Sequence, residues 1–290
     1  MNNIVNQKEL LGAIDKILLK SSTAKRVSDT QKMNGPVGII TGATYDRVND
    51  KLKTLTEEVQ ASTKKIRTEF TLETLQDMAT TYGENFYDVL AHYLINEITY
   101  QIDEDFLTKI KGRASTKKTL TFSGADFNNA LYSVGQSIAI TVNKGLCDLP
   151  ISDNRSPQGW AVVSSNVASL LGGVLGDTAK GSLDDDSPSY LGRIAGVDYY
   201  IDYTHPNDGE DSIVFGIKGN GVSKGSTIYS PYTTEWIDMQ NPEDGEKIFF
   251  LLVRSALTIN PLDKEYLDKG EDSAFLGKIN VDLTDLEVFK

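Results

Sequence analysis

The chain has 290 residues, 39% of them hydrophobic, which is enough to bury a substantial core in one large domain or in two closely packed lobes. The 41 acidic residues outnumber the 29 basic ones and give a formal net charge of −12. Because no long cluster of Lys or Arg is available to neutralise phosphates, sequence-specific binding of nucleic acid is not expected. The single cysteine, Cys147, excludes an internal disulfide and a cysteine-based metal site, and we expect it to be buried in the core. No stretch approaches the roughly 20 apolar residues of a membrane span.

The N-terminal part of the chain combines a helical pattern with extended ones. Residues 4–19 place apolar side chains on one stripe of an amphipathic helix, and a polar stretch to residue 32 follows, which is typical of an arm that docks on a neighbour. The segment 33–47 starts with turn residues and continues with the Val, Ile and Thr of a strand. The charged, Thr-rich segment 48–67 predicts a solvent-exposed excursion such as a long hairpin or a short helix.

The segment 70–111 carries the clearest periodicity in the chain. Its apolar residues recur at three- and four-residue steps, which predicts a mostly helical segment. Gly83 marks a break, so we expect a short first helix and a second one of about 27 residues, about 40 Å long at 1.5 Å per residue. Gly112 is expected to end the second helix.

The segment 119–175 alternates between strand and helix. We expect a strand at 119–122, a helix at 126–142, a strand at 160–165 and a helix at 166–175. This alternation indicates a lobe of the α/β or α+β class. The loop 176–189 that follows is polar and is expected at the surface.

The second half of the chain is rich in strand patterns. Three runs, 197–203, 212–218 and 226–232, are separated by turn residues and are expected to pair in one sheet. The last strong run, 247–262, is apolar enough to be covered on both faces over much of its length. The tail after it is charged, and we expect it to pack on another subunit.

Residue patterns that carry chemistry are weak throughout the chain. Three glycine-rich stretches lack the lysine of a phosphate-binding loop and are interpreted as turns. The two histidines, His92 and His205, offer few options for catalysis or metal binding, and packing roles are favoured. Consecutive carboxylates can hold a hard cation such as calcium, but the spacing of a calcium loop is missing, so a solvated acidic loop is favoured. No catalytic, cofactor-binding or metal-binding residue is therefore predicted; the acidic loop consists of Asp184, Asp185 and Asp186.

The amino-acid sequences of several segments resemble those of the major capsid proteins of T-even-type (T4-like) tailed bacteriophages. MNGPVGIITGATYDR, at 33–47, resembles the segment that leads into their extended loop. FTLETLQDMATTYGENFYDVLAHYLINEITYQIDEDFL, at 70–107, resembles their paired helices around a break. WAVVSSNVASLLG, YLGRIAGVDYYIDYTHP, SIVFGIKGNGVSKGSTIYSPYTTEW and RSALTINPL then follow in the order of that family, so the resemblance covers about 33–262.

The resemblance implies an α+β fold of the HK97 type. It divides the chain into an N-terminal arm at 1–33, an extended-loop region at 34–69, a peripheral lobe with a long spine helix at 70–118 and 236–290, and an axial α/β lobe at 119–235. The extended-loop region is short and the N-terminal part is brief, which speaks against an inserted domain there and against a long cleaved propeptide.

The resemblance also implies a structural function without catalysis. The chain is expected to assemble with itself into hexamers and pentamers of an icosahedral head that encloses double-stranded DNA without sequence-specific binding. Portal and scaffold proteins are expected partners. Whether a decoration protein binds as well is left open, and neither a membrane nor a cofactor is expected. The protein is expected in the virion capsid, with assembly in the cytoplasm of the host bacterium.

Three aromatic residues, Tyr229, Tyr232 and Trp236, are candidates for organising the axial lobe or its subunit contacts, because buried aromatic anchors dominate interface energy. Simple core packing explains them equally well. If the axial-lobe assignment holds, the acidic loop at 184–186 lies near a symmetry axis. The carboxylates of several copies would repel one another there unless cations bind them.

Other functions stay open at this stage. An encapsulin-like compartment shares the fold and encloses a cargo protein, and a vertex-specific relative forms pentamers only. A soluble α/β enzyme with an unrecognised carboxylate site is the alternative from another class. Some capsids of this fold cross-link a loop lysine to an asparagine of a neighbouring subunit, and residues in superficially suitable regions here are Lys51, Lys53, Lys64, Lys65 and Asn260. Exposed solubilising lysines are the favoured interpretation.

Overall fold

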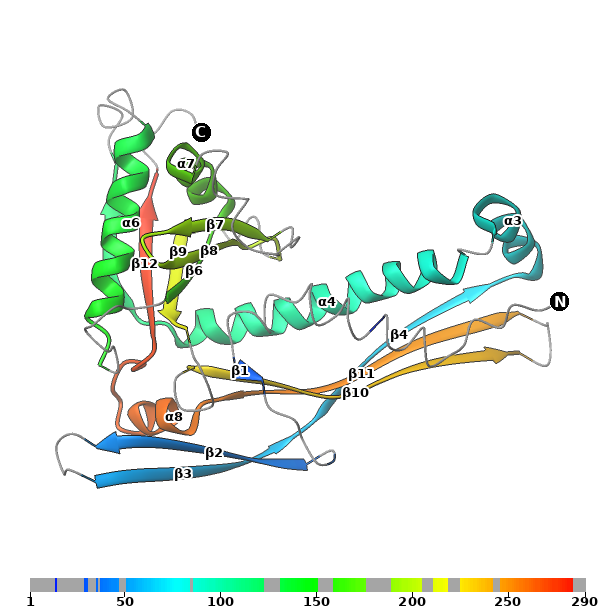
Figure 1. Cartoon of the computed structure of the whole chain (residues 1–290), viewed down its shortest axis with the longest axis horizontal. Helices are drawn as coiled ribbons and strands as arrows, with labels where there is room; N and C mark the ends of the chain where they lie inside the picture. Colours follow the sequence, from blue (N-terminus) through cyan, green and yellow to red (C-terminus); the bar gives the residue numbers. More distant parts are fainter. Residues whose placement is uncertain are drawn as a thin grey trace.

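The computed structural model describes residues 14, 29–30, 35, 37–46, 51–83, 86–122, 131–150, 159–175, 189–204, 211–218, 225–241 and 246–283. Its architecture is α+β, as expected (Figure 1). A long body consists of helices α3 and α4 over a four-stranded sheet, and a compact body consists of a six-stranded sheet with helices α6 and α7. A two-stranded hairpin lies on the side of the four-stranded sheet away from the compact body. Of the predicted helix at 4–19, only residue 14 is described.

Helices α3 (Leu72–Tyr82) and α4 (Phe86–Arg113) confirm the predicted pair and the break between them. Thr71 caps α3, because its hydroxyl accepts the N–H of Thr74 at 3.3 Å. Gly83 follows α3 with φ +60°, a conformation that glycine adopts without steric cost. With 28 residues, α4 is about 42 Å long at 1.5 Å per residue. One stripe of α4 is buried: Leu90, Leu94, Ile95, Ile98, Ile102, Phe106 and Ile110.

The four-stranded sheet has the order β1 (Asp29–Thr30), β10 (Thr227–Gln240), β11 (Lys247–Ile259) and β4 (Ser62–Phe70). Phe249, Leu251 and Val253 of β11 are buried in the same core as α4, while the residues between them are half-exposed. The expectation that this strand is covered on both faces is therefore wrong for the single chain, because its side chains alternate between a buried and an open face.

Strand β10 continues well past the predicted end at residue 232. Beyond residue 232, β10 stays paired with β11. Pairing with β11 therefore extends β10 through residues whose polar pattern does not predict a strand. The register shifts between Pro231 and Thr233, which leaves Tyr232 as the extra residue of a β-bulge. A proline beside a bulge is expected, since proline has no N–H for the ladder.

The six-stranded sheet has the order β5 (Thr116–Thr121), β12 (Leu276–Asp282), β9 (Ser212–Ile217), β6 (Gly159–Val163), β8 (Val197–Ile201) and β7 (Tyr190–Ile194). One face packs on α6 (Leu131–Cys147) and α7 (Ser165–Leu175) in one apolar cluster. The opposite face shares its core with α4. The two bodies are therefore joined by a continuous apolar core that has α4 in its middle.

The C-terminal part differs most from expectation. The predicted strand 247–262 ends at residue 259, because Asn260 caps helix α8 (Pro261–Asp268) and Pro261 occupies its first turn. Strand β12 was not predicted, and it pairs with β5 and β9. The division into lobes at 118, 119, 235 and 236 stays a prediction, but the sheets do not follow these limits, since β12 joins the six-stranded sheet and β10 belongs to the four-stranded one.

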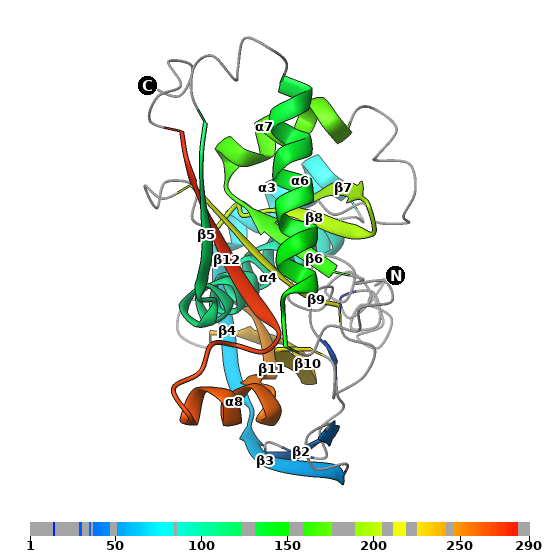
Figure 2. The same ribbon diagram turned by 90° about the vertical axis from the view of Figure 1, so that its left-hand side faces the viewer.

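The hairpin consists of β2 (Val37–Asp46) and β3 (Lys51–Gln60), paired along their whole length. Strand β2 confirms the strand expected within 33–47, whereas the segment 48–67, expected as a long hairpin or a short helix, supplies β3 and the first residues of β4. Helix α8 lies beside the hairpin in both views (Figures 1 and 2).

Cys147 at the end of α6 is exposed, so its expected burial is wrong. The helix ends five residues later than predicted, at Cys147 itself, and this position points away from the core. None of the described helices has the length and apolar character needed to cross a membrane.

Candidate functional site

The residues predicted as contact sites lie in different surroundings. The loop with Asp184, Asp185 and Asp186 lies outside the described residues. Tyr229 and Trp236 are both buried within the single chain, at 2% and 7% exposure, and Tyr232 is half-buried at the bulge of β10. A role of these aromatic residues in subunit contacts stays a prediction, and little of Tyr229 or Trp236 is left for a neighbour to cover.

Tyr229 lies where α4 meets the four-stranded sheet. Burial raises the pKa of its hydroxyl to about 12, nearby Asp103 adds to the shift, and a hydrogen bond with Ser255 opposes it. Trp236 packs against Phe249 of β11 with ring centroids 5.8 Å apart, and Phe249 also contacts Phe70 at 6.1 Å. These aromatic residues belong to the apolar core that also contains the buried stripe of α4.

The hairpin β2–β3 presents apolar side chains to solvent. Val37 is 46% exposed and Ile39 is 67% exposed, and Ile39 pairs with Glu58, which is also exposed. On the opposite face, Val59 is buried against Ile228 and Ala256 at the base of the hairpin. Two-stranded hairpins are marginally stable on their own, so a hairpin of this length with two exposed apolar side chains is suited to contact another molecule.

Polar contacts fix the point where the hairpin leaves the body. Lys64 of β4 forms an ion pair with Asp105 of α4, with Nζ 2.7 Å from Oδ2. Beyond Ser255 the strand β11 no longer pairs with β4, and there Lys109 Nζ donates to the carbonyl of Leu257 at 2.6 Å. Desolvation lowers the pKa of Lys109, and the charge of Asp105 opposes the shift. These contacts set the direction in which the hairpin projects.

The open face of the four-stranded sheet combines cations with apolar groups. Lys65 Nζ lies 4.1 Å from the ring centroid of Phe250, and the Arg67 guanidinium lies 5.8 Å from the same centroid. Such cation–π contacts contribute about 0.5–1 kcal/mol each at exposed sites. Two of the lysines considered for cross-linking, Lys64 and Lys65, are thus engaged within their own chain.

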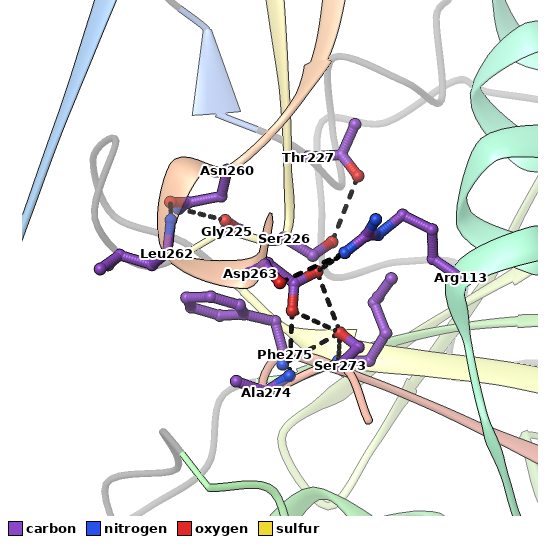
Figure 3. A network of polar contacts seen from close by, with 11 residues as sticks. Arg113, Gly225, Ser226, Thr227, Asn260, Leu262, Asp263, Ser273, Ala274 and Phe275 are labelled. Carbon is purple, nitrogen blue, oxygen red and sulfur yellow. Dashed lines mark hydrogen bonds and ion pairs between the residues drawn. The ribbon is translucent and has the colours of Figure 1, made fainter. Parts of the chain in front are cut away.

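Asn260 is fully buried and uses its side-chain amide inside the chain (Figure 3). Its Nδ2 donates to the carbonyl of Gly225 at 2.6 Å, and its Oδ1 accepts the N–H of Leu262 at 3.0 Å. A side chain enclosed in this way is not accessible to a lysine of a neighbour. Asn260 therefore caps α8 and joins the end of β11 to the residue Gly225 before β10, and it is not placed for cross-linking.

No described residues assemble into a metal-binding cluster: groups of three or more His, Cys, Asp or Glu side chains at suitable distances are absent from the described part of the chain. The contacts found are those of a scaffold: buried ion pairs, caps and cross-strand pairs. Chemically, the arrangement can bind and orient other protein surfaces.

A family model described as "Major capsid protein Gp23" matches residues 51–281. The chain belongs to this family. Its members are structural proteins of the capsid and not enzymes, and the resemblance to T-even-type major capsid proteins is confirmed. The match includes α4, β3 of the hairpin and every strand of the two larger sheets except β1 and the last residue of β12.

Among known sequences, the major capsid protein of Vibrio phage KVP40 (isolate Vibrio parahaemolyticus/Japan/Matsuzaki/1991) is 22% identical to this chain over 198 residues. The match covers 60% of this chain and 38% of the phage protein. The chain therefore corresponds to well under half of this relative's length.

Solved structures share the fold at low identity. A virus-like particle from Pyrococcus furiosus matches with TM-score 0.57 and 10% identity, covering 94% of this chain and 98% of that one. The capsid of a native GTA particle gives 0.55 and 12%, covering 90% and 91%. The SrpI encapsulin of Synechococcus elongatus PCC 7942 gives 0.55 and 9%, covering 98% and 93%. The expected HK97-type fold is confirmed.

The sequence predictions missed the residues of α4 that form polar contacts with distant segments of the chain. Asp103, Asp105 and Lys109 lie on α4 as ordinary polar positions. The partners of Lys109 and Asp103 are 148 and 100 residues away in the chain. The hairpin face with Val37 and Ile39 carried a readable signal, the alternation of a strand, but the sequence does not tell whether such a face is covered by its own chain.

Proposed function

We propose that this chain is the major capsid subunit of a tailed bacteriophage, which assembles with itself into the hexamers and pentamers of an icosahedral head around double-stranded DNA. Portal and scaffold proteins are further partners in this proposal, and assembly takes place in the cytoplasm of the host bacterium before the protein becomes part of the virion. Family membership over residues 51–281 supports the structural role.

The observation that carries self-assembly is the projecting hairpin with the exposed apolar side chains of Val37 and Ile39. Ile39 is 67% exposed on a hairpin that projects from the body, and contacts at its base, such as Lys64 with Asp105, set its direction. Because the same surface must make similar contacts in rings of five and six copies, a projecting element on a firm base is a suitable connector. Extensive burial between copies then replaces a catalytic centre as the basis of function.

The test is assembly of the expressed protein, alone and together with the neighbouring phage genes. Negative-stain electron microscopy and light scattering should reveal closed shells, tubes or isolated rings. A chain that stays monomeric even with those partners contradicts the proposal and returns attention to a soluble enzyme.

An encapsulin-like compartment is the second candidate, and the fold likeness to the SrpI encapsulin supports it. The contents of purified particles discriminate between the two. DNA inside particles from infected cells supports a phage head, whereas a single co-purifying protein and no DNA supports the compartment.

A further inference from the structure

The end of β8 runs into a short polar segment, residues 202–204, that lies along α4. Tyr203 donates its hydroxyl to Asp103 Oδ2 at 2.6 Å, and the Tyr100 hydroxyl donates to the carbonyl of Thr204 at 3.1 Å. The rings of Tyr100 and Tyr203 also contact each other, with centroids 5.8 Å apart. These contacts join the compact body to the middle of α4.

A second contact lies further along the same helix. Lys111 Nζ is 2.6 Å from Asp202 Oδ2, and Asp202 is almost fully buried. The other carboxylate oxygen, Oδ1, accepts the N–H of Thr204 at 3.0 Å and its hydroxyl at 2.9 Å. Asp103 and Lys111 are about 12 Å apart along the axis at 1.5 Å per residue, so the segment is held at two separated points.

Asp103 connects the compact body with the four-stranded sheet as well. It is fully buried, and its charge acts on the hydroxyl of Tyr229 on β10. A buried carboxylate is tolerated only where donors surround it, so the positions of Tyr203 and α4 are tightly specified by this one group.

The apolar part of the same interface has no such directionality. One face of the six-stranded sheet, with Trp160, Val162 and Val214, packs in the core that also holds the buried stripe of α4. Apolar burial depends on the area removed from water and not on an angle, so this contact specifies the orientation of the sheet on the helix less sharply than polar contacts do. Hydrogen bonds and ion pairs depend on distance and angle, and they select one arrangement.

We propose that a polar latch, consisting of Tyr100, Asp103, Lys111, Asp202, Tyr203 and Thr204, fixes the angle of the compact body on α4 and thereby sets the curvature of the assembled shell. The part that concerns curvature rests on the proposed function. The angle itself is a property of the single chain, because all six residues belong to one copy.

Two paired substitutions each remove one of the two carboxylate contacts of the latch without leaving a buried charge. Asp103→Asn with Tyr203→Phe removes the first contact as a neutral pair. Lys111→Met with Asp202→Asn removes the second, and the asparagine still accepts from Thr204. Each pair is also tested alone, so that the question is answered even if the combination of both does not fold.

The matched control is an exposed ion pair, Lys117 with Asp272, whose Nζ and Oδ2 are 2.7 Å apart, close to the 2.6 Å between Lys111 and Asp202. Lys117→Met with Asp272→Asn has the same chemistry outside the latch. Spin labels report the angle: on a Cys147→Ser background, Ile140→Cys labels α6 of the compact body and Met239→Cys labels β10 of the long body, both at exposed positions. The labelled chain is diluted in excess unlabelled chain.

Pulsed electron spin resonance then measures the distance distribution between the two labels. We expect a narrow distribution for the unaltered and control chains, and a broader or shifted one for each latch pair. Distributions of equal width and position in the latch and control chains overturn the latch.

Electron microscopy of the same variants tests the effect on curvature. Shells of varied diameter or open sheets are expected from latch variants, next to uniform shells from the control. Uniform shells from latch variants overturn the link to curvature. If the unaltered chain forms no shells, the proposed function fails, and the distance measurement still decides about the latch.

Discussion

Arg113 and Asp263 are 150 residues apart in the chain, yet Arg113 Nη2 lies 3.1 Å from Asp263 Oδ2, and the Asp263 side chain is fully buried (Figure 3). The other oxygen of Asp263 accepts the N–H of Ala274 at 2.9 Å and the Ser273 hydroxyl at 2.8 Å. One carboxylate thus ties the end of α4 to α8 and to the residues before β12. This polar junction of α4 is separate from the latch and from the contacts of Asp105 and Lys109 with the four-stranded sheet.

Asp263→Ala should destabilise the chain by about 3–5 kcal/mol, because it leaves the nearly buried Arg113 guanidinium without its partner. Urea denaturation of the unassembled chain measures the loss. Asp272→Ala is the control, since its ion pair with Lys117 is exposed and should contribute less than about 1 kcal/mol. Equal losses in the two variants would show that the buried junction is not important for stability.

Elements with complete local signals were predictable from the sequence. Helix α4 has an apolar stripe over its whole length and follows the break marked by Gly83, and the strand that became β11 contains the apolar run 248–253. Two missed elements also carried signals that a neighbouring pattern obscured. Asn260 followed by Pro261 is a helix start, but the apolar run continues to Leu262 and hid it.

Strand β12 shows the same limitation. Ile279 and Val281 alternate with polar residues and are buried, as in a half-buried strand, but the surrounding charges led to its interpretation as a tail. Contacts between distant segments had no signal at all. Nothing local marks Asp103 as the partner of Tyr203, because their proximity is created by the packing of the six-stranded sheet on α4.

Gly277→Ala and Gly172→Ala should change stability in opposite directions. A Cβ at Gly277 on β12 would overlap the ring of Phe215, which is fully buried and cannot move aside. We expect a loss of about 1–3 kcal/mol, the usual cost of overpacking. Gly172 in α7 has nothing within 4 Å of such a Cβ, so alanine should add up to about 1 kcal/mol through its helix propensity. Thermal unfolding of both variants decides; two losses of equal size would contradict the packing described.

The raised pKa of Tyr229 predicts that the chain loses stability at alkaline pH. Burial raises its pKa to about 12 from 10.0, so the folded chain holds the proton more tightly than the unfolded chain. The resulting stability is complete below pH 10 and is lost as the pH rises through 12, by about 1.4 kcal/mol per pH unit. Tyr229→Phe should remove this component, so its unfolding free energy should fall less steeply from pH 10 to 12. Tyr93→Phe, at an exposed tyrosine, is the control.

Ala195 is strained in the turn between β7 and β8. It has φ +49° and is followed by Gly196 with φ +87°, the pattern of a two-residue type I′ turn in which alanine is unfavourable. Ala195→Gly should therefore stabilise the chain by about 0.5–1 kcal/mol. Ala79→Gly in the exposed part of α3 should do the opposite and cost about 1 kcal/mol. Denaturant midpoints that fall for both variants would exclude strain at Ala195.

Ile39 allows assembly to be separated from folding. Because it is 67% exposed in the single chain, Ile39→Asp should change the unfolding free energy by less than about 0.5 kcal/mol. If the hairpin connects subunits, the same change places a charge in an apolar contact and should abolish closed shells. Ile140→Asp on α6 is the control, since this isoleucine is equally exposed at 67%. Light scattering and electron microscopy measure assembly; closed shells at normal yield from Ile39→Asp would remove the hairpin from the contacts that build the shell.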